Sequence, residues 1–134
     1  MNLYQDIHAA LRTHLRAMPS VPDIAMTNYD FDAQADQTYL KEYFLPGETI
    51  KACYGRAGKD LYNGIYQVSV HIPDNTGLST LPDQIANHFY LGELTNDDAT
   101  VEILSTSQGV GLNDDTHYII PVSIRWQSYT AARI

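Results

Sequence analysis

The sequence predicts an α+β fold in which two α-helices pack on one face of a single antiparallel β-sheet. Two segments repeat apolar residues with helical spacing, whereas several others alternate apolar and polar residues as half-buried strands do. Short turn-forming sequences separate most of the strands, and such connections favour antiparallel pairing. The chain has 134 residues, which suits one core rather than two, so we expect one domain over residues 1–134.

The first element is expected to be an amphipathic helix over residues 3–17. Its apolar residues recur every four positions and form one stripe: Leu3, Ile7, Leu11 and Leu15. Pro19 and Pro22 follow the stripe and end the helix, since proline disrupts helical hydrogen bonding.

The next segment is expected to contain a short strand, a surface loop and a hairpin. Residues 24–26 are apolar enough for the short strand, and residues 30–38 are polar and acidic, as surface loops are. Residues 39–45 and 49–55 are rich in strand formers, and the intervening Pro46, Gly47 and Glu48 are typical turn residues. We therefore predict that these two runs pair with each other.

The second half of the chain is expected to supply the remaining strands and the second helix. Residues 56–63 read as a mobile connection into a clear strand over residues 66–72. Apolar residues then step by three or four through a helix ending near Tyr90. Two further strands follow at residues 101–104 and 118–126, joined through a turn.

The composition excludes several functional classes. A net charge of −8 repels phosphate and argues against binding nucleic acid independently of its sequence. Cys53 is the single cysteine, so neither an internal disulfide nor a cysteine-built zinc site is indicated. No apolar run is long enough for a membrane span or a secretory signal, so we expect no membrane contact and a cytoplasmic location.

The sequence contains no convincing catalytic, cofactor or metal motif. Gly55, Gly58 and Lys59 lack the spacing and the hydroxyl residue of a phosphate-binding loop. Paired aspartates at residues 97–98 and 114–115 suit turns better than a calcium loop. The five histidines are scattered without metal-ligand spacing: His8, His14, His71, His88 and His117. We therefore predict no enzyme activity, no metal and no cofactor.

Two features indicate contact surfaces. Tyrosine is unusually abundant, with ten Tyr against three Phe, and it is enriched at protein interfaces, although tyrosines also line core edges. The strand faces opposite the expected core carry polar residues, so this face is either solvated or an assembly surface: Gln67, Ser69, His71, Ser123, Arg125 and Gln127.

Three segments carry a resemblance to a known family. They are LPGET at residues 45–49, GIYQVSVHIP at residues 64–73 and IPVSIRWQSY at residues 120–129. Their order and spacing, together with the two helices, resemble the tail terminators, which are small tail-completion proteins of long-tailed bacteriophages and prophages. The resemblance extends over nearly the whole chain.

The resemblance implies a structural protein without catalysis. Its subunits would form a six-fold ring that caps the tail tube, stops tube growth and joins the tail to the neck. The implied partners are further copies of itself, the tail tube protein and a neck or head-completion protein, while genomic DNA passes through without specific binding. The protein would assemble in the host cytoplasm and remain in the virion tail. For the subunit or tube contacts we predict Arg56, Lys59, Tyr62 and Arg125.

Two other functions stay open on the sequence. A head-to-tail connector or tube subunit would share the acidity and the self-association. A small-ligand-binding domain or enzyme would instead need a concave pocket with convergent polar groups.

Overall fold

A computed structural model describes the chain at residues 3–48, 50–51, 59–74, 79–90, 93–96, 99–114 and 116–131. These residues form two helices, which are α1 (Leu3–Arg16) and α2 (Leu81–His88). They also form eight strands, which are β1 (Asp23–Ala25), β2 (Tyr39–Pro46), β3 (Ile50–Lys51), β4 (Lys59–Pro73), β5 (Glu93–Asn96), β6 (Ala99–Gln108), β7 (Leu112–Asn113) and β8 (His117–Ala131).

The strands belong to one mixed, curled sheet with the order β1-β2-β4-β8-β6-β5. β3 pairs with β4, and β7 pairs with β8. The α+β class is as predicted, but the purely antiparallel sheet is wrong, because β1 runs parallel to β2. The long connection over residues 26–38 allows this arrangement, since parallel neighbours need a crossover rather than a tight turn.

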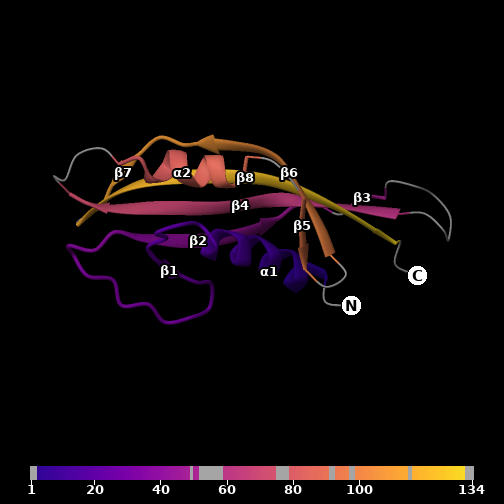
Figure 1. Cartoon of the computed structure of the whole chain (residues 1–134), viewed down its shortest axis with the longest axis horizontal. Helices are drawn as coiled ribbons and strands as arrows, with labels where there is room; N and C mark the ends of the chain where they lie inside the picture. Colours follow the sequence, from indigo (N-terminus) through magenta and orange to yellow (C-terminus); the bar gives the residue numbers. More distant parts are fainter. Residues whose placement is uncertain are drawn as a thin grey trace.

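The sheet curls around α1 (Figure 1). At one end of the sheet order, Tyr4 and His8 of α1 contact Phe44 of β2, and at the other end α1 contacts β5 and β6. α2 lies over β8 and β6 on the same face of the sheet. Both helices therefore share one core with the sheet, as the sequence predicted.

β4 and β8 form the centre of the sheet. They pair without interruption from Lys59 opposite Ala131 to Pro73 opposite His117. Residues 59–63 are therefore strand, and the prediction of a mobile connection there is wrong. Gly64 made this strand look interrupted in the sequence. Glycine is nevertheless required at this position, because a Cβ there would lie 2.5 Å from the Leu45 carbonyl oxygen.

The predicted hairpin between residues 39–45 and 49–55 is also wrong. β2 pairs with β4 from Tyr39 opposite His71 to Pro46 opposite Gly64. β3 then pairs with the preceding residues of β4, Leu61 and Asp60. The Gly47 amide donates to the Asn63 carbonyl at 2.7 Å, so the predicted turn is an irregularity within one edge of the sheet. Residues 52–58 lie outside the described residues.

The core lies between the helices and the even-numbered residues of the two central strands. Its largest buried side chains include Trp126, Tyr62, Tyr66 and Phe89. Burying such aromatic side chains stabilises the fold by roughly 1.5–3 kcal/mol each. Even residues facing the core leave odd residues on the opposite face, which we call the outer face.

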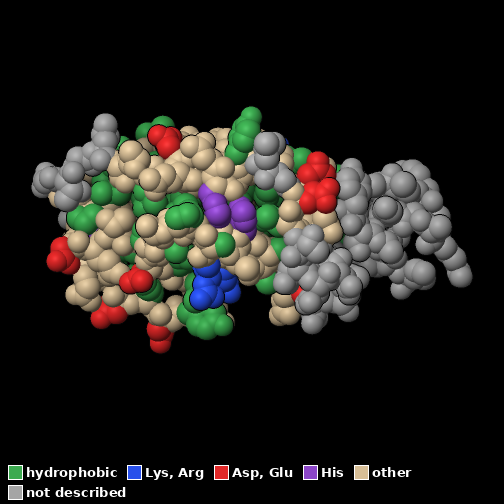
Figure 2. Space-filling view, in the orientation of Figure 1, with side chains coloured by type: hydrophobic (Ala, Val, Ile, Leu, Met, Phe, Trp, Pro, Cys, Tyr) green, Lys and Arg blue, Asp and Glu red, His purple; other side chains and the backbone are tan. Residues whose placement is uncertain are grey.

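Two histidines join the ends of the helices. The His14 and His88 rings stack at 4.0 Å, and each Nε2 lies within hydrogen-bonding distance of the other residue's carbonyl oxygen, at 2.7 and 2.6 Å. Figure 2 shows histidine side chains near the middle of this helical side, with acidic side chains towards its rim. Burial lowers the pKa of His14, which favours a neutral His14 ring in this arrangement.

Candidate functional site

The outer face of the sheet carries a mixed row of apolar and charged side chains. Leu45 of β2 pairs with Ile65 of β4, Ile65 pairs with Arg125 of β8, and Arg125 pairs with Ser105 of β6. The register therefore aligns these four residues across the sheet on one face. A β-bulge follows Ile103 and adds Leu104 to the same region.

Arg125 lies in a shallow groove with apolar walls. The groove has a volume of about 340 Å³, and its apolar lining includes Leu45, Leu61, Ile65 and Leu104. Leu45 and Leu104 are 47% and 45% exposed, although both are large hydrophobic residues. Within the described part of the chain, Arg125 has no carboxylate partner. The groove can therefore accept an apolar side chain together with a carboxylate.

Two of the four predicted contact residues have described side chains, and these two lie in different environments. Arg125 is exposed on the outer face. Tyr62 is fully buried on the opposite face, where its ring meets that of Tyr4 at 5.5 Å. Lys59 begins β4, but its side chain lies outside the described residues, as does all of Arg56.

The apolar part of this groove was not predicted from the sequence. Leu45 belongs to the alternation of β2, which places Tyr43 and Leu45 on the face opposite Glu42 and Phe44. That alternation was available as a signal. Leu104 could not be found in the same way, because the bulge after Ile103 interrupts the alternation of β6.

A second exposed apolar feature is the segment from Gly109 to Leu112. Val110 is 85% exposed and Leu112 is 66% exposed. Backbone hydrogen bonds hold this segment in place, because the Gly109 amide donates to the Pro121 carbonyl at 2.8 Å and β7 pairs with β8. The exposed side chains are thus presented by an anchored backbone.

A buried carboxylate lies on the core side of β2. Glu42 accepts hydrogen bonds from Tyr66 Oη at 2.6 Å, from Arg12 Nε at 2.9 Å and from the Thr27 amide at 3.0 Å. His8 Nε2 lies 3.1 Å from the same carboxylate. Burial alone would raise the pKa of Glu42, but the bonds from His8, Arg12 and Tyr66 outweigh it and hold this pKa well below its usual range.

The geometry of the Glu42 cluster indicates a role in stabilising the fold. Its carboxylate is completely buried and both of its oxygens are bonded within the chain. The cluster joins α1 to β2, β4 and the segment that follows β1, and it leaves no oxygen for a substrate. The cluster was not predicted from the sequence, because its members come from α1, β2, β4 and the segment that follows β1.

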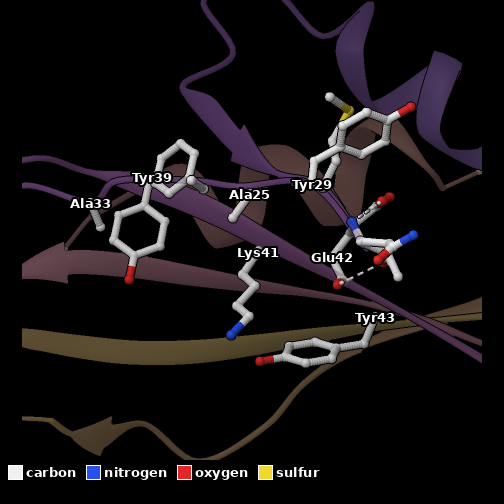
Figure 3. A pocket seen from close by; sticks show the side chains of 11 residues that line it. Ala25, Tyr29, Ala33, Tyr39, Lys41, Glu42 and Tyr43 are labelled. Atoms are coloured by element: carbon white, nitrogen blue, oxygen red, sulfur yellow. Dashed lines mark hydrogen bonds between the residues drawn. The ribbon is translucent and has the colours of Figure 1, made fainter.

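A hollow of about 390 Å³ lies between β2 and the segment over residues 25–33. Figure 3 shows Tyr39, Lys41 and Tyr43 extending from one side of β2, while Glu42 points to the other. The Lys41 ammonium lies 5.4 Å from the centre of the Tyr43 ring, a cation–π contact. This hollow is aromatic, and Lys41 is the one cationic residue among the described residues that line it.

The outer face is covered at the other end of β4. The Tyr39 ring stacks on His71 at 4.3 Å, and Phe31 contacts Tyr39 from the loop over residues 30–38. His117 Nε2 lies 2.8 Å from the Gln37 carbonyl oxygen. Burial, with His117 nearby, lowers the pKa of His71 to about 4. The polar face predicted from the sequence is thus exposed around Arg125 and closed around His71.

The described residues contain neither a clustered metal site nor a helix suited to cross a membrane. Among the residues that the structure describes, no three of the His, Cys, Asp and Glu side chains gather as a metal site would require. No described helix has both the length and the hydropathy needed to cross a membrane.

Comparisons with known proteins give a family match and a fold match. The family model described as "Phage tail terminator protein" matches residues 6–126. No curated protein matches the chain. One solved structure aligns over 99% of this chain and 100% of its own, with a TM-score of 0.70 at 22% sequence identity. At that identity the likeness concerns the fold alone.

Proposed function

The chain belongs to the phage tail terminator family, and from that premise we propose that six copies close into a ring at the head-proximal end of the tail tube. The family is structural, and its members are components of the virion tail. In the proposed role the ring ends polymerisation of the tube and joins the tail to the neck or head. Assembly would take place in the host cytoplasm.

The observation that carries this proposal is the family match over residues 6–126, which includes nearly all described elements. The exposed groove around Arg125 supports it, because a ring subunit needs an apolar surface beside polar groups for its neighbours. Arg125, Arg56 and Lys59 are proposed to contribute to subunit or tube contacts. The proposed partners are the tail tube protein and a neck protein.

The net charge of the chain supports passage of DNA through the ring without binding. Eight Lys and Arg stand against sixteen Asp and Glu. A strongly acidic subunit repels phosphate, so genomic DNA can pass through a ring of such subunits without being held.

The test combines native mass spectrometry and negative-stain imaging over a concentration series, with and without the tail tube protein of the same phage. We expect closed rings of six, and tubes that stop growing when the protein is added. Open tubes formed by this chain itself would favour a tube subunit instead. Unaltered tube growth together with a strictly monomeric protein would overturn the proposal.

A set of variants tests the proposed basic contacts. Replacing Arg56, Lys59 and Arg125 together by Ala should reduce ring formation and tail joining while the protein stays folded. Because this set removes positive charge, Arg16→Ala serves as a control, since Arg16 is exposed on α1. Normal tail joining by the triple variant would count against these contacts.

A further inference from the structure

We propose that copies of this chain join head to tail, with the segment from Gly109 to Leu112 of one copy seated in the groove around Arg125 of the next. This inference rests on the proposed function, and it names the surfaces that would form the ring. The apolar parts of both surfaces are exposed in the single chain and differ in shape, one being projecting and the other hollow.

The projecting surface is suited to insertion. Val110 is the most exposed of the large hydrophobic residues that the structure describes, and Leu112 follows on the same short segment. Gly109 is bonded to Pro121, and the Asp114 amide donates to the His117 carbonyl at 2.7 Å, so both ends of the segment are fixed to β8. A fixed backbone loses little conformational entropy on binding.

The receiving surface is suited to an apolar side chain. Its walls include Leu45, Ile65 and Leu104, and Gly64 also lines it. Burying Val110 against these walls would remove apolar surface from water on both copies. Apolar walls that stay exposed to water raise the free energy of the single chain. An assembly that covers them is therefore favoured.

Charge fixes the direction of the contact. Arg125 lies within the groove and has no carboxylate partner in the described residues. The projecting segment runs directly into the exposed Asp114. An Arg–carboxylate pair beside an apolar contact strengthens and orients an interface. Two acidic copies would otherwise repel each other, since each carries a net charge of −8.

The two surfaces lie at different places on the chain, so the same contact can repeat from one copy to the next. β7 pairs with β8 at Tyr118 and Ile119, whereas the groove uses Arg125 and Trp126 of the same strand. At about 3.3 Å per residue the two surfaces are roughly 20 Å apart. A contact between two different patches is heterologous, so each copy can bind one neighbour through each patch and the series can close into a ring.

Disulfide trapping tests the contact directly. In a Cys53→Ser background, Val110→Cys is combined with Leu104→Cys and the full chain is oxidised mildly. We expect a ladder of covalent multimers on non-reducing gels, because every interface would contain one cysteine of each kind. Each single-cysteine variant should stay monomeric on the same gel. A control pairs Val110→Cys with Tyr90→Cys, which is exposed after α2 and should give no ladder.

A second variant measures assembly without cross-linking. Val110→Lys should raise the concentration needed for ring formation at least tenfold, because it would place a second cation beside Arg125 in the groove, whereas Tyr90→Lys, another exposed hydrophobic residue made basic, should not. Circular dichroism should show both variants folded, since both side chains are exposed.

The outcomes separate this inference from the proposed function. Rings of the unmodified chain, without a ladder and with no effect of Val110→Lys, would overturn the inference and leave the function standing. A ladder formed by a protein that never stops tube growth would support the contact and overturn the function. Absence of rings and of the ladder would overturn both.

Discussion

The Tyr66 hydroxyl donates to the Glu42 carboxylate at 2.6 Å, deep inside the fold. This bond joins β4 to β2, and Arg12 adds α1 to the same carboxylate. A carboxylate without water must be surrounded by donors, because burying an unpaired charge is very costly. The pair therefore fixes how the helix sits against the strand whose opposite face lines the Arg125 groove.

Glu42→Gln tests the importance of this carboxylate for stability. The substitution keeps the shape of the side chain but leaves the Arg12 guanidinium without its counter-charge, so we expect a loss of about 3 kcal/mol in the free energy of unfolding. Urea denaturation at pH 7.5 measures it. Glu93→Gln, on an exposed residue of β5, is the matched control and should change little. Equal effects of the two substitutions would contradict the prediction.

Local patterns made the helices and the central strands predictable, because their periodicity lies within a few residues. The polar contacts were not predictable in this way. Arg12 and Glu42 are thirty positions apart, and nothing near either residue indicates the other. The pairing of β2 was misread for the same reason, since Pro46 and Gly47 have turn chemistry whether the chain reverses or merely shifts along β4.

At the contact site, Arg125 was predictable from the sequence, but the groove around it was not. The alternation of β8 places Arg125 opposite the core residues Ile124 and Trp126, which was sufficient to identify its face. The groove depends on four neighbouring strands, β2, β4, β8 and β6, and on the bulge after Ile103 in β6, and these relationships arise only from the sheet order.

Acid is expected to destabilise the fold through its buried histidines. The pKa values of His14 and His71 are both lowered by burial, with that of His71 at about 4. In the unfolded chain the histidine pKa is near 6.5, so below that pH the unfolded chain binds more protons than the folded chain. Stability should be fully present above pH 6.5 and should fall as the pH decreases towards 4, by up to about 1.4 kcal/mol per pH unit for each proton.

His71→Phe tests the contribution of one of these histidines. Phenylalanine keeps the aromatic contact with Tyr39 and removes two buried ring nitrogens that have no hydrogen-bond partner in the described structure. Urea denaturation at pH 7.5 and pH 5 should show a smaller difference in the variant than in the unmodified protein. An unchanged difference would show that His71 does not contribute to the acid sensitivity.

The reciprocal histidine contact between the helices should have a measurable coupling energy. His14→Ala and His88→Ala each remove one ring from the stack and one bond to the opposite carbonyl. A double-mutant cycle by urea denaturation should give a coupling of about 1 kcal/mol, because either single change already breaks the stacking. Strictly additive losses would mean that the two rings stabilise the fold independently.

Gly64→Ala should destabilise the sheet beneath the groove. The added Cβ would lie 2.5 Å from the Leu45 carbonyl oxygen and 2.8 Å from the Trp126 ring, and neither the backbone nor a fully buried ring can move freely. We expect a loss of about 1–3 kcal/mol in the free energy of unfolding. Gly47→Ala is the control, because the nearest obstacle there is the end of the Asn63 side chain, which can rotate away. A loss for Gly64→Ala no larger than for Gly47→Ala would show that β2 and β4 can separate at this point, and the floor of the groove would then be adaptable rather than fixed.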